Sequence, residues 1–275
     1  MVVGDILPIH DAADAYDEYA SRYDRLLTEN RINAYMRREM SRALTATFGT
    51  GKRLIELGCG TGDEALALAP NQSEIFAFDP SLRMIEIASR KAAASGTGGN
   101  VRFSVGKATD LLRHLGDESQ KTGFDGGYAS FSLSYEPDLR VVSKALAPWI
   151  RPGGWFVMAT MNRICGVEFA GALLSAHPRL AGRRLEKRTL HKVGAYSTPI
   201  FPRTTKEVID AVRDYFHFED VRALPVIMPP PYANRAVAGW GALLDILAEL
   251  DSHLGSFPVI RLFGDHNLLR FRRNT

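Results

Sequence analysis

The stretch Leu54-Ile55-Glu56-Leu57-Gly58-Cys59-Gly60-Thr61-Gly62 decides the fold of this 275-residue chain. An apolar run of strand length ends there at three glycines on alternate positions, and a second apolar run, Ser73–Phe78, ends at the acid Asp79. Only glycine combines the φ values and the close backbone approach of a tight strand-to-helix turn. The following helix offers its N–H groups and positive dipole end to a negative group of a ligand. This order of elements indicates a nucleotide-type cofactor site on an α/β sheet.

Bulk composition agrees with a soluble globular protein of one large domain, or one domain with insertions. The formal net charge is +3, which is too small to make the whole molecule a polyanion binder. Cys59 and Cys165 lie far apart and lack zinc-ligand spacing, so we expect a reduced, cytoplasmic protein without a metal site. No run reaches the length of a membrane span, and no basic region precedes an apolar one at the N-terminus, so neither a membrane segment nor a leader is expected.

Strands alternate with helices through residues 51–161, which predicts a parallel sheet with right-handed crossovers. The predicted strands are Arg53–Leu57, Glu74–Asp79, Val101–Val105, Gly123–Phe131 and Trp155–Met161. The predicted helices are Asp11–Leu27, Arg31–Thr47, Asp63–Ala69, Ser81–Ser95, Thr109–Leu115 and Asp138–Ile150, the last one kinked near Pro148. Their periodicity places Leu82 inward on the helix that Ser81 caps, and Arg37 outward on the second helix.

The alternation stops after Met161, and we expect a substrate-binding insertion over residues 162–203. Its part 163–192 holds seven Lys and Arg residues against two acids. A capping box at Thr204–Glu207 then opens a helix, Phe216–Ala223 is strand-like, Arg235–Leu254 is a very apolar helix, and Asn267–Phe271 is the last strand. We expect one domain, with a helical lid (1–50), a cofactor-binding core (51–161), the insertion, and a C-terminal half (204–275) that carries the helical insertion 235–254.

Two classes of cofactor fit the glycine turn. Dinucleotide sites use G-x-G-x-x-G, but here the third glycine comes one residue early and Asp63 takes the position that the dinucleotide pattern requires. An acid there would repel a pyrophosphate, which disfavours a nicotinamide oxidoreductase. A carboxylate at Asp79, at the end of the neighbouring strand, can accept hydrogen bonds from a ribose diol.

Glu56–Gly62 closely resembles the first motif of class I S-adenosylmethionine-dependent methyltransferases of the type 11/25 kind. Four later segments resemble, in order, the ribose-binding segment, the adenine-side segment, the fourth strand and the turn into the fifth strand of that family: Phe78–Ile85, Val105–Leu111, Phe124–Phe131 and Leu146–Gly154. The resemblance covers about Ala12 to Met161. It implies a Rossmann-like, doubly wound α/β fold, with a seven-strand, mostly parallel sheet, an antiparallel last strand and helical insertions that form a substrate lid.

The resemblance also implies S-adenosyl-L-methionine as the cofactor and a set of residues around it. The glycine turn would lie under the methionine portion, with Glu56 near its amino group, and Asp79 would hold the ribose hydroxyls. The other contacts are implied at the adenine, the methyl group and a lid. The implied cofactor-binding residues are Tyr23, Glu56, Gly58, Cys59, Gly60, Gly62, Asp79, Pro80, Met84, Ala108, Thr109, Ser130 and Phe131. Lys107 stands where many relatives have an acid, and Asp110 either substitutes for that acid or simply begins a helix.

Tyr16, Tyr19 and Tyr23 form one aromatic stripe on the first predicted helix. Core packing and a lid over the cofactor are equally favoured for this stripe, and Tyr23, which Asp24 follows, is slightly ahead of the others as a cofactor contact.

Methyl transfer requires alignment and exclusion of water, and a general base only if the acceptor enters protonated. No pattern singles out one of His177, His191, His217, His253 and His266. His266 is the best histidine because Asp265 precedes it at a strand edge. Tyr135 and Glu136 lie closer in sequence to the expected reaction centre. For all three candidates a purely structural role is the alternative.

The predicted acceptor is a small, partly hydrophobic metabolite under a roof made by 162–203 and 235–254. The apolar roof residues are Phe169, Leu173, Leu174, Tyr196, Phe201, Trp240, Leu243, Leu244 and Leu247. The pattern does not distinguish an oxygen, nitrogen or carbon acceptor, and it leaves homo-oligomer formation open.

A nucleic-acid methyltransferase is the second hypothesis, and Ser132–Pro137 disfavours it because the Asn/Asp-Pro-Pro-aromatic motif is missing there. The basic stretch 179–192 fits a solvated face better than an RNA site. The third hypothesis is a non-catalytic assembly partner. Against it, the glycines and Asp79 are all present, and we expect no structural reason for them to occur together.

Overall fold

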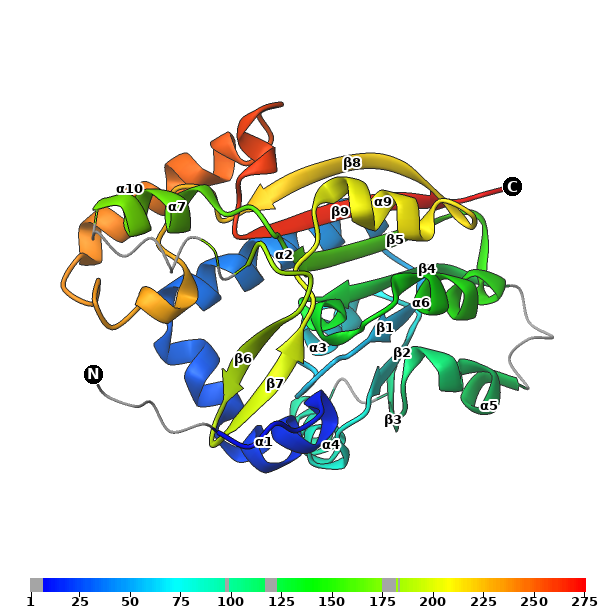
Figure 1. Cartoon of the computed structure of the whole chain (residues 1–275). Coiled ribbons are helices and arrows are strands. Elements are labelled where there is room, and N and C mark those ends of the chain that lie inside the picture. Colours follow the sequence, from blue (N-terminus) through cyan, green and yellow to red (C-terminus); the bar gives the residue numbers. More distant parts are fainter. Residues whose placement is uncertain (1–6, 97–98, 117–122, 175–181, 183) are drawn as a thin grey trace.

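The computed structural model describes residues 7–96, 99–116, 123–174, 182 and 184–275. A seven-stranded sheet in the order β3-β2-β1-β4-β5-β9-β8 forms its centre (Figure 1). The strands are β1 (Arg53–Leu57), β2 (Glu74–Asp79), β3 (Val101–Val105), β4 (Phe124–Ser130), β5 (Ile150–Met161), β8 (Phe216–Leu224) and β9 (His266–Arg273). Strands β1 to β5 pair in parallel, whereas β9 lies antiparallel between β5 and β8. The predicted fold class is therefore confirmed.

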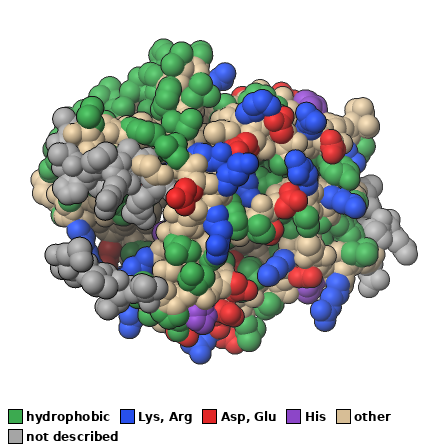
Figure 2. All heavy atoms as spheres, in the orientation of Figure 1, with side chains coloured by type: hydrophobic (Ala, Val, Ile, Leu, Met, Phe, Trp, Pro, Cys, Tyr) green, Lys and Arg blue, Asp and Glu red, His purple; other side chains and the backbone are tan. Residues whose placement is uncertain are grey.

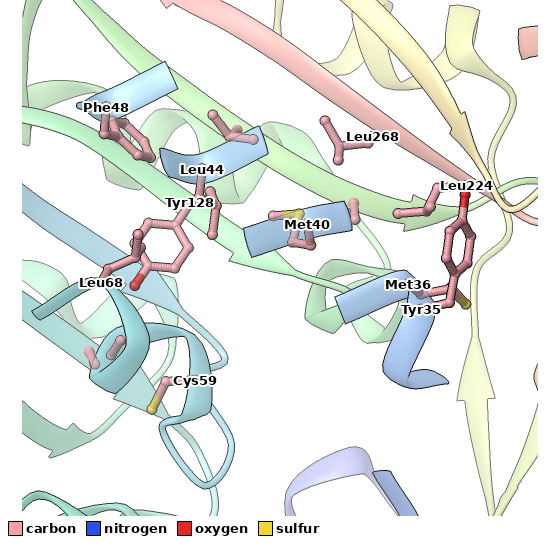
Figure 3. Packing of buried hydrophobic residues seen from close by; sticks show 14 of the residues in the cluster. Tyr35, Met36, Met40, Leu44, Phe48, Cys59, Leu68, Tyr128, Leu224 and Leu268 are labelled. Carbon is pink, nitrogen blue, oxygen red and sulfur yellow. The ribbon is translucent and has the colours of Figure 1, made fainter. Parts of the chain in front are cut away.

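Helices cover both faces of this sheet because its strand residues alternate between two apolar clusters. Leu54 of β1 belongs to the cluster shared with α2, α3, α4 and α10, and Ile55 to the cluster shared with α5, α6 and α9. Figure 3 shows α2 laying Met40, Leu44 and Phe48 along the first of these faces. The helices are α1 (Ala12–Glu29), α2 (Arg31–Phe48), α3 (Asp63–Leu68), α4 (Leu82–Ser95), α5 (Leu111–Leu115), α6 (Leu139–Leu146), α7 (Gly166–Leu174), α9 (Thr205–Val212) and α10 (Gly241–Leu254).

Several predicted details of these elements are wrong at their ends. Leu82 is 56% exposed, so its predicted inward position is wrong; the buried face of α4 starts at Met84 and Ile85, and Ser81 caps the helix as predicted. The helix predicted for 138–150 ends at Leu146 and continues as one 3₁₀ turn, Ala147–Trp149, since Pro148 lacks the N–H that an α-helix needs. Strand β5 starts at Ile150, earlier than predicted.

The insertion after Met161 contains α7 and an antiparallel hairpin of β6 (Thr189–Val193) and β7 (Tyr196–Ile200), which was not predicted. Its turn uses Gly194 at φ +56°. The parts of the predicted insertion at 175–181 and 183 lie outside the described residues. The helix predicted to begin at Arg235 begins at Gly241 instead. Turns precede it, in a segment where glycine at 239 lowers helix propensity by about 1 kcal/mol relative to alanine.

Exposed apolar side chains gather over α7, α10 and the segment after α10, at the upper left of Figure 2. They include Leu173, Leu243, Ile246, Leu250, Phe257, Val259 and Leu262. None of the described helices combines the length and the hydropathy that crossing a membrane requires.

Candidate active site

A cavity of about 920 Å³ runs along the carboxyl ends of the parallel strands. Its wall includes Leu57 at the end of β1, Asp79 at the end of β2, Ser130 at the end of β4 and Met161 at the end of β5. Open α/β sheets bind their ligands at this edge. The volume lies near the upper end of the range for small-molecule sites, so it can hold a cofactor together with a small acceptor.

The cavity brings together all but three of the predicted cofactor residues. Those that line it are Tyr23, Gly58, Gly60, Asp79, Pro80, Met84, Ala108, Thr109, Ser130 and Phe131. Glu56, Cys59 and Gly62 are not part of the wall. We refer to Gly58, Gly60, Asp79, Met84 and Ala108 as the glycine-turn end of the cavity.

The glycine turn has a structural reason of its own at two of its three glycines. Gly58 and Gly62 have φ values of +71° and +81°. A Cβ atom on Gly58 would lie 2.3 Å from Cβ of Ser132, and one on Gly62 would lie 2.7 Å from Cζ of Phe103. A Cβ on Gly60 would meet only Tyr23, at 3.5 Å. Packing alone therefore accounts for Gly58 and Gly62, which leaves Gly60 and Asp79 as the part of the pattern that packing does not require.

Asp79 is held by the backbone of the turns around it. Its Oδ2 accepts a hydrogen bond from the Gly60 N–H at 2.8 Å, and its Oδ1 accepts one from the Ser81 N–H at 2.9 Å. Burial raises the pKa of this carboxyl to about 6, against the opposing effect of these two N–H donors. Each oxygen keeps a further lone pair, so the carboxylate can still accept from a diol in the cavity.

Arg37 lines the cavity, so the prediction that it points outward is wrong. Its guanidinium pairs with Glu64 at 2.5 Å and hydrogen-bonds the Tyr23 hydroxyl. Glu56 lies fully buried close by, where the Tyr128 hydroxyl donates to its Oε2 at 3.2 Å and its Oε1 has no partner. Burial, followed by the charge of Glu64, raises the pKa of Glu56 well above its usual range. A cation bound in the cavity would thus lie close to the buried carboxyl groups of Glu56 and Glu64, which are not themselves part of the wall.

Asp63 also differs from its predicted role. Its carboxylate pairs with Lys91 and lies 3.7 Å from Arg37, and the residue is not part of the cavity wall. Repulsion of a pyrophosphate by Asp63 is therefore a weaker argument than the sequence suggests, since two cations neutralise this acid.

Tyr16 and Tyr23 of the aromatic stripe line the cavity, whereas Tyr19 packs beside Gly194 of the hairpin. The Tyr16 hydroxyl lies 2.6 Å from the Tyr135 hydroxyl, which lies 2.8 Å from Nδ1 of His191. The Tyr16 ring meets the ring of Tyr23 edge-on at 5.8 Å. Side chains of α1, of the segment after β4 and of β6 thus form one chain at the cavity wall, which favours the lid interpretation over core packing.

His266 lines the cavity at the start of β9. Its Nδ1 lies 2.7 Å from Oδ2 of Asp265, and among the described residues none hydrogen-bonds its Nε2. The ring meets the Phe131 ring edge-on at 5.3 Å. Phe131 has φ +64°, a strained conformation for a bulky residue that is concentrated at functional sites.

Arg184 and Glu168 complete this part of the wall. Arg184 lies 2.6 Å from Oδ1 of Asp265 and 2.7 Å from Oε1 of Glu168. Burial alone would raise the pKa of the Asp265 carboxyl, but the charge of Arg184, together with the hydrogen bonds from Arg184 and His266, outweighs burial and holds that pKa well below its usual range. We refer to Phe131, Glu168, Arg184, Asp265 and His266 as the His266 end of the cavity.

The remaining sequence candidates divide between the wall and the exterior. Tyr135, Glu136 and His191 line the cavity. His217 and His253 do not, and His177 lies outside the described residues. Asp110 does not line it either: its carboxylate accepts from the Lys107 N–H and caps the 3₁₀ turn Ala108–Asp110.

The predicted apolar roof is wrong for its described side chains, none of which lines the cavity. Leu244 is buried in the core against α2, and Leu173 is 83% exposed. The insertion contributes polar and small apolar residues to the wall instead, namely Glu168, Arg184, Thr189, Leu190, His191, Lys192 and Ile200. Four further residues line the cavity but were not predicted to do so, because their local sequence patterns are those of ordinary surface residues: Arg37, Glu168, Arg184 and Tyr232.

Comparison with known proteins agrees with this geometry. Residues 54–154 match the family described as methyltransferase domain. The chain is similar to the O-methyltransferase rstn1 of Aspergillus nomiae, with 30% identity over 151 residues, which are 52% of this chain and 64% of that protein. It is also similar to the demethylmenaquinone methyltransferase of Geobacillus kaustophilus, with 30% identity over 147 residues, covering 52% and 59%. The chain thus spans less than two thirds of the length of these relatives.

A solved structure extends the likeness in fold to nearly the whole chain. The geranyl diphosphate C-methyltransferase from Streptomyces coelicolor, solved with S-adenosyl-L-homocysteine, has a TM-score of 0.56 at 16% identity. The superposition covers 98% of this chain and 90% of that one.

Proposed function

We propose that this chain, which carries a class I S-adenosylmethionine-dependent methyltransferase domain, transfers a methyl group to the hydroxyl of a small metabolite. We further propose that residues 1–275 act as one methyltransferase domain. The observation that carries the proposal is a single cavity whose one end is the glycine turn with Asp79 and whose other end is the Asp265–His266 pair. The named methyltransferases that the chain resembles support it.

The glycine-turn end suits S-adenosylmethionine. Asp79 presents a carboxylate to a ribose diol, and Met84 and Ala108 offer apolar surface for an adenine. Arg37 offers a cation to a carboxylate, and Oε1 of Glu56, which has no partner among the described residues, lies behind the wall, where an ammonium group would favour the ionised form of this buried carboxyl. When bound, this cofactor supplies an electrophilic methyl group on a sulfonium, which needs no activation by the protein.

The His266 end supplies what the acceptor needs. An alcohol or phenol must lose its proton as it attacks, and a positioned histidine is the usual group that takes it. Because Nδ1 of His266 faces Asp265, Nε2 is the atom that accepts the proton. The rings of Phe131 and of the tyrosine chain line the space between the two ends and keep water away from it.

Calorimetry tests the cofactor. S-Adenosylhomocysteine should bind and NADH should not, and the reverse result would overturn the methyltransferase proposal. Asp79→Ala should weaken S-adenosylhomocysteine binding by about 1.5–3 kcal/mol, the usual range for hydrogen bonds to a charged group. An unchanged affinity would remove Asp79 from the site. Asp220→Ala is the matched control, because Asp220 is a carboxylate at a distant sheet edge, paired with Arg270.

The structure weakens the nucleic-acid alternative. Two of the basic residues in the insertion, Arg163 and Arg184, are bound within the protein to Glu207, Glu168 and Asp265. Salt-dependent retention of a mixed RNA pool would support that alternative. Formation of S-adenosylhomocysteine with a panel of phenols and enols separates the proposed enzyme from a non-catalytic cofactor-binding protein.

A further inference from the structure

The acids around His266 outnumber the cations there. Two carboxylates, Asp265 and Glu168, lie at the His266 end, each with a side chain less than a tenth exposed. A histidine in contact with a buried carboxylate, here Asp265, would normally take up a proton and stay charged, since an opposite charge within about 4–6 Å favours the charged form by roughly 1–3 pKa units. A histidine that is already protonated cannot act as a base.

Arg184 is the cation that faces both acids. Its Nη2 lies 2.6 Å from Asp265 and 2.7 Å from Glu168, and its Nη1 donates to the backbone oxygen of Asp265 at 3.1 Å. The side chain is only 9% exposed, so solvent screens these contacts little. The backbone and carboxylate contacts together fix Asp265 in the orientation in which its other oxygen, Oδ2, meets His266.

The other titratable groups that pack here do not change this balance. The thiol of Cys165 lies 3.9 Å from Oδ1 of Asp265, and burial, followed by the charge of Asp265, raises its pKa, so it stays protonated and neutral. The hydroxyl of Tyr232 hydrogen-bonds Glu168, and burial and that charge raise its pKa likewise. Directly after β4, the uncharged ring of Phe131 meets the His266 ring edge-on.

We propose that Arg184 is a positioning residue that keeps His266 neutral and aimed. It neutralises Asp265 and Glu168, so that Asp265 stays ionised and holds Nδ1 of His266 while Nε2 remains free to accept a proton. The role as an aid to catalysis rests on the proposed function, in which His266 is the base. The charge arrangement does not rest on it, and can be measured without turnover.

The experiment is a histidine titration by NMR on the full chain with ¹⁵N-labelled histidine and S-adenosylhomocysteine added, with the His266 signal assigned by its loss in His266→Asn. In the parent protein the neutral ring should carry its proton on Nδ1. Arg184→Met should raise the titration midpoint of His266 by about 1 pH unit, because one buried positive charge is lost. Glu168→Gln should lower that midpoint, because one buried negative charge is lost.

The opposite signs of these two shifts distinguish a charge effect from damage to the fold. Arg184→Lys keeps the charge and should leave the midpoint close to the parent value. Arg163→Met is the matched control: Arg163 is another partly buried arginine of the insertion, paired with Glu207 at 2.7 Å, and its loss should not move the midpoint.

The proposal is overturned if the midpoint moves in the same direction in Arg184→Met and Glu168→Gln, or if it stays where it is in both. If Arg184→Met does not fold, the downward shift in Glu168→Gln and the unchanged midpoint in Arg184→Lys still decide the matter. A failed S-adenosylhomocysteine binding test alongside the expected shifts would refute the proposed function and leave the charge arrangement standing.

Discussion

The two ends of the cavity are held in place by different parts of the chain. At the glycine-turn end the partners are backbone groups: Asp79 accepts from the N–H groups of Gly60 and Ser81, all within one short segment. At the His266 end the partners are side chains. Asp265 contacts its neighbour His266 and also Arg184, which lies about 80 residues earlier in the chain. A site whose residues are held by backbone groups depends on the conformation of the chain. A site whose residues are held by charged side chains depends on the balance of those charges. Substitutions should therefore affect folding at the first end and chemistry at the second.

The largest expected effect is on turnover at the His266 end. His266→Asn keeps a side chain able to donate to Asp265 but removes the proton acceptor, so methyl transfer should fall by about 10²–10⁴-fold. The rate of S-adenosylhomocysteine formation is measured with the best acceptor from a panel of phenols and enols. Affinity for S-adenosylhomocysteine, measured by calorimetry, should change little. A variant that retained the full rate would show that alignment alone suffices.

The next effect is on folding at the glycine-turn end. Gly62→Ala combines a positive φ with a contact of 2.7 Å to Phe103, and should lower the free energy of unfolding by about 3 kcal/mol or more. Gly60→Ala, the control, meets only the φ penalty, about 1 kcal/mol. Urea unfolding compares the two variants. Equal losses would mean that packing behind the turn is unimportant.

A smaller effect is the pH dependence that Asp79 should give to ligand affinity and to stability at the glycine-turn end. Burial raises the pKa of Asp79 to about 6, and a diol donates to its ionised form, so affinity for S-adenosylhomocysteine should fall by up to tenfold for each pH unit below about 6. Folding of the free protein should respond with the opposite sign. Because the pKa of Asp79 is higher in the folded state, this residue's contribution to stability decreases as pH rises from about 4 to about 6. Calorimetry and urea unfolding of the parent and of Asp79→Asn across pH 4–8 measure both slopes. Parallel pH profiles for the two proteins would contradict the assignment to Asp79.

The smallest effect concerns the tyrosine chain that borders both ends. Tyr135→Phe removes the hydroxyl between Tyr16 and His191, and should lower the free energy of unfolding by about 1 kcal/mol. Tyr196→Phe is the control, because its hydroxyl bonds Glu18 at an exposed position, where less is lost. Thermal unfolding compares the two, and a larger loss in the control would show that the half-buried tyrosine chain does not fasten the lid.

The predictability of the two ends from sequence follows the same division. Strands β1, β2 and β3 begin and end at the predicted residues, because each is a short apolar run bounded by glycine, asparagine or an acid. The turn at Gly58 and the position of Asp79 follow directly, since a parallel sheet brings neighbouring strand ends together. Local pattern is enough when the partners of a side chain are backbone groups of its own turn and of the neighbouring parallel strand's turn.

The other end requires information that no local pattern holds. Arg184 has the surroundings of a surface arginine, and only the fold shows that its partner Asp265 is buried; Arg37, near the glycine turn, escaped prediction for the same reason, since its partner Glu64 is buried. Strand β6 escaped prediction because its residues are mostly polar and exposed, which is typical of a two-stranded hairpin outside a core. His266 was recognised as a candidate through its neighbour Asp265, but Phe131 reaches it across more than 130 residues of chain.

The position of β9 has a consequence for the order in which the protein can assemble. Residues 266–273 lie between β5 and β8, so β8 has no partner strand in the sheet until this late segment has been synthesised. Long-range pairings of this kind slow folding and leave strand edges open meanwhile. The same segment brings His266 to the cavity, so the cavity wall is complete only when the sheet is complete. A nascent chain that stops before residue 266 would therefore carry the glycine turn but no proton acceptor from β9, and would depend on chaperones to cover the open edge of β5.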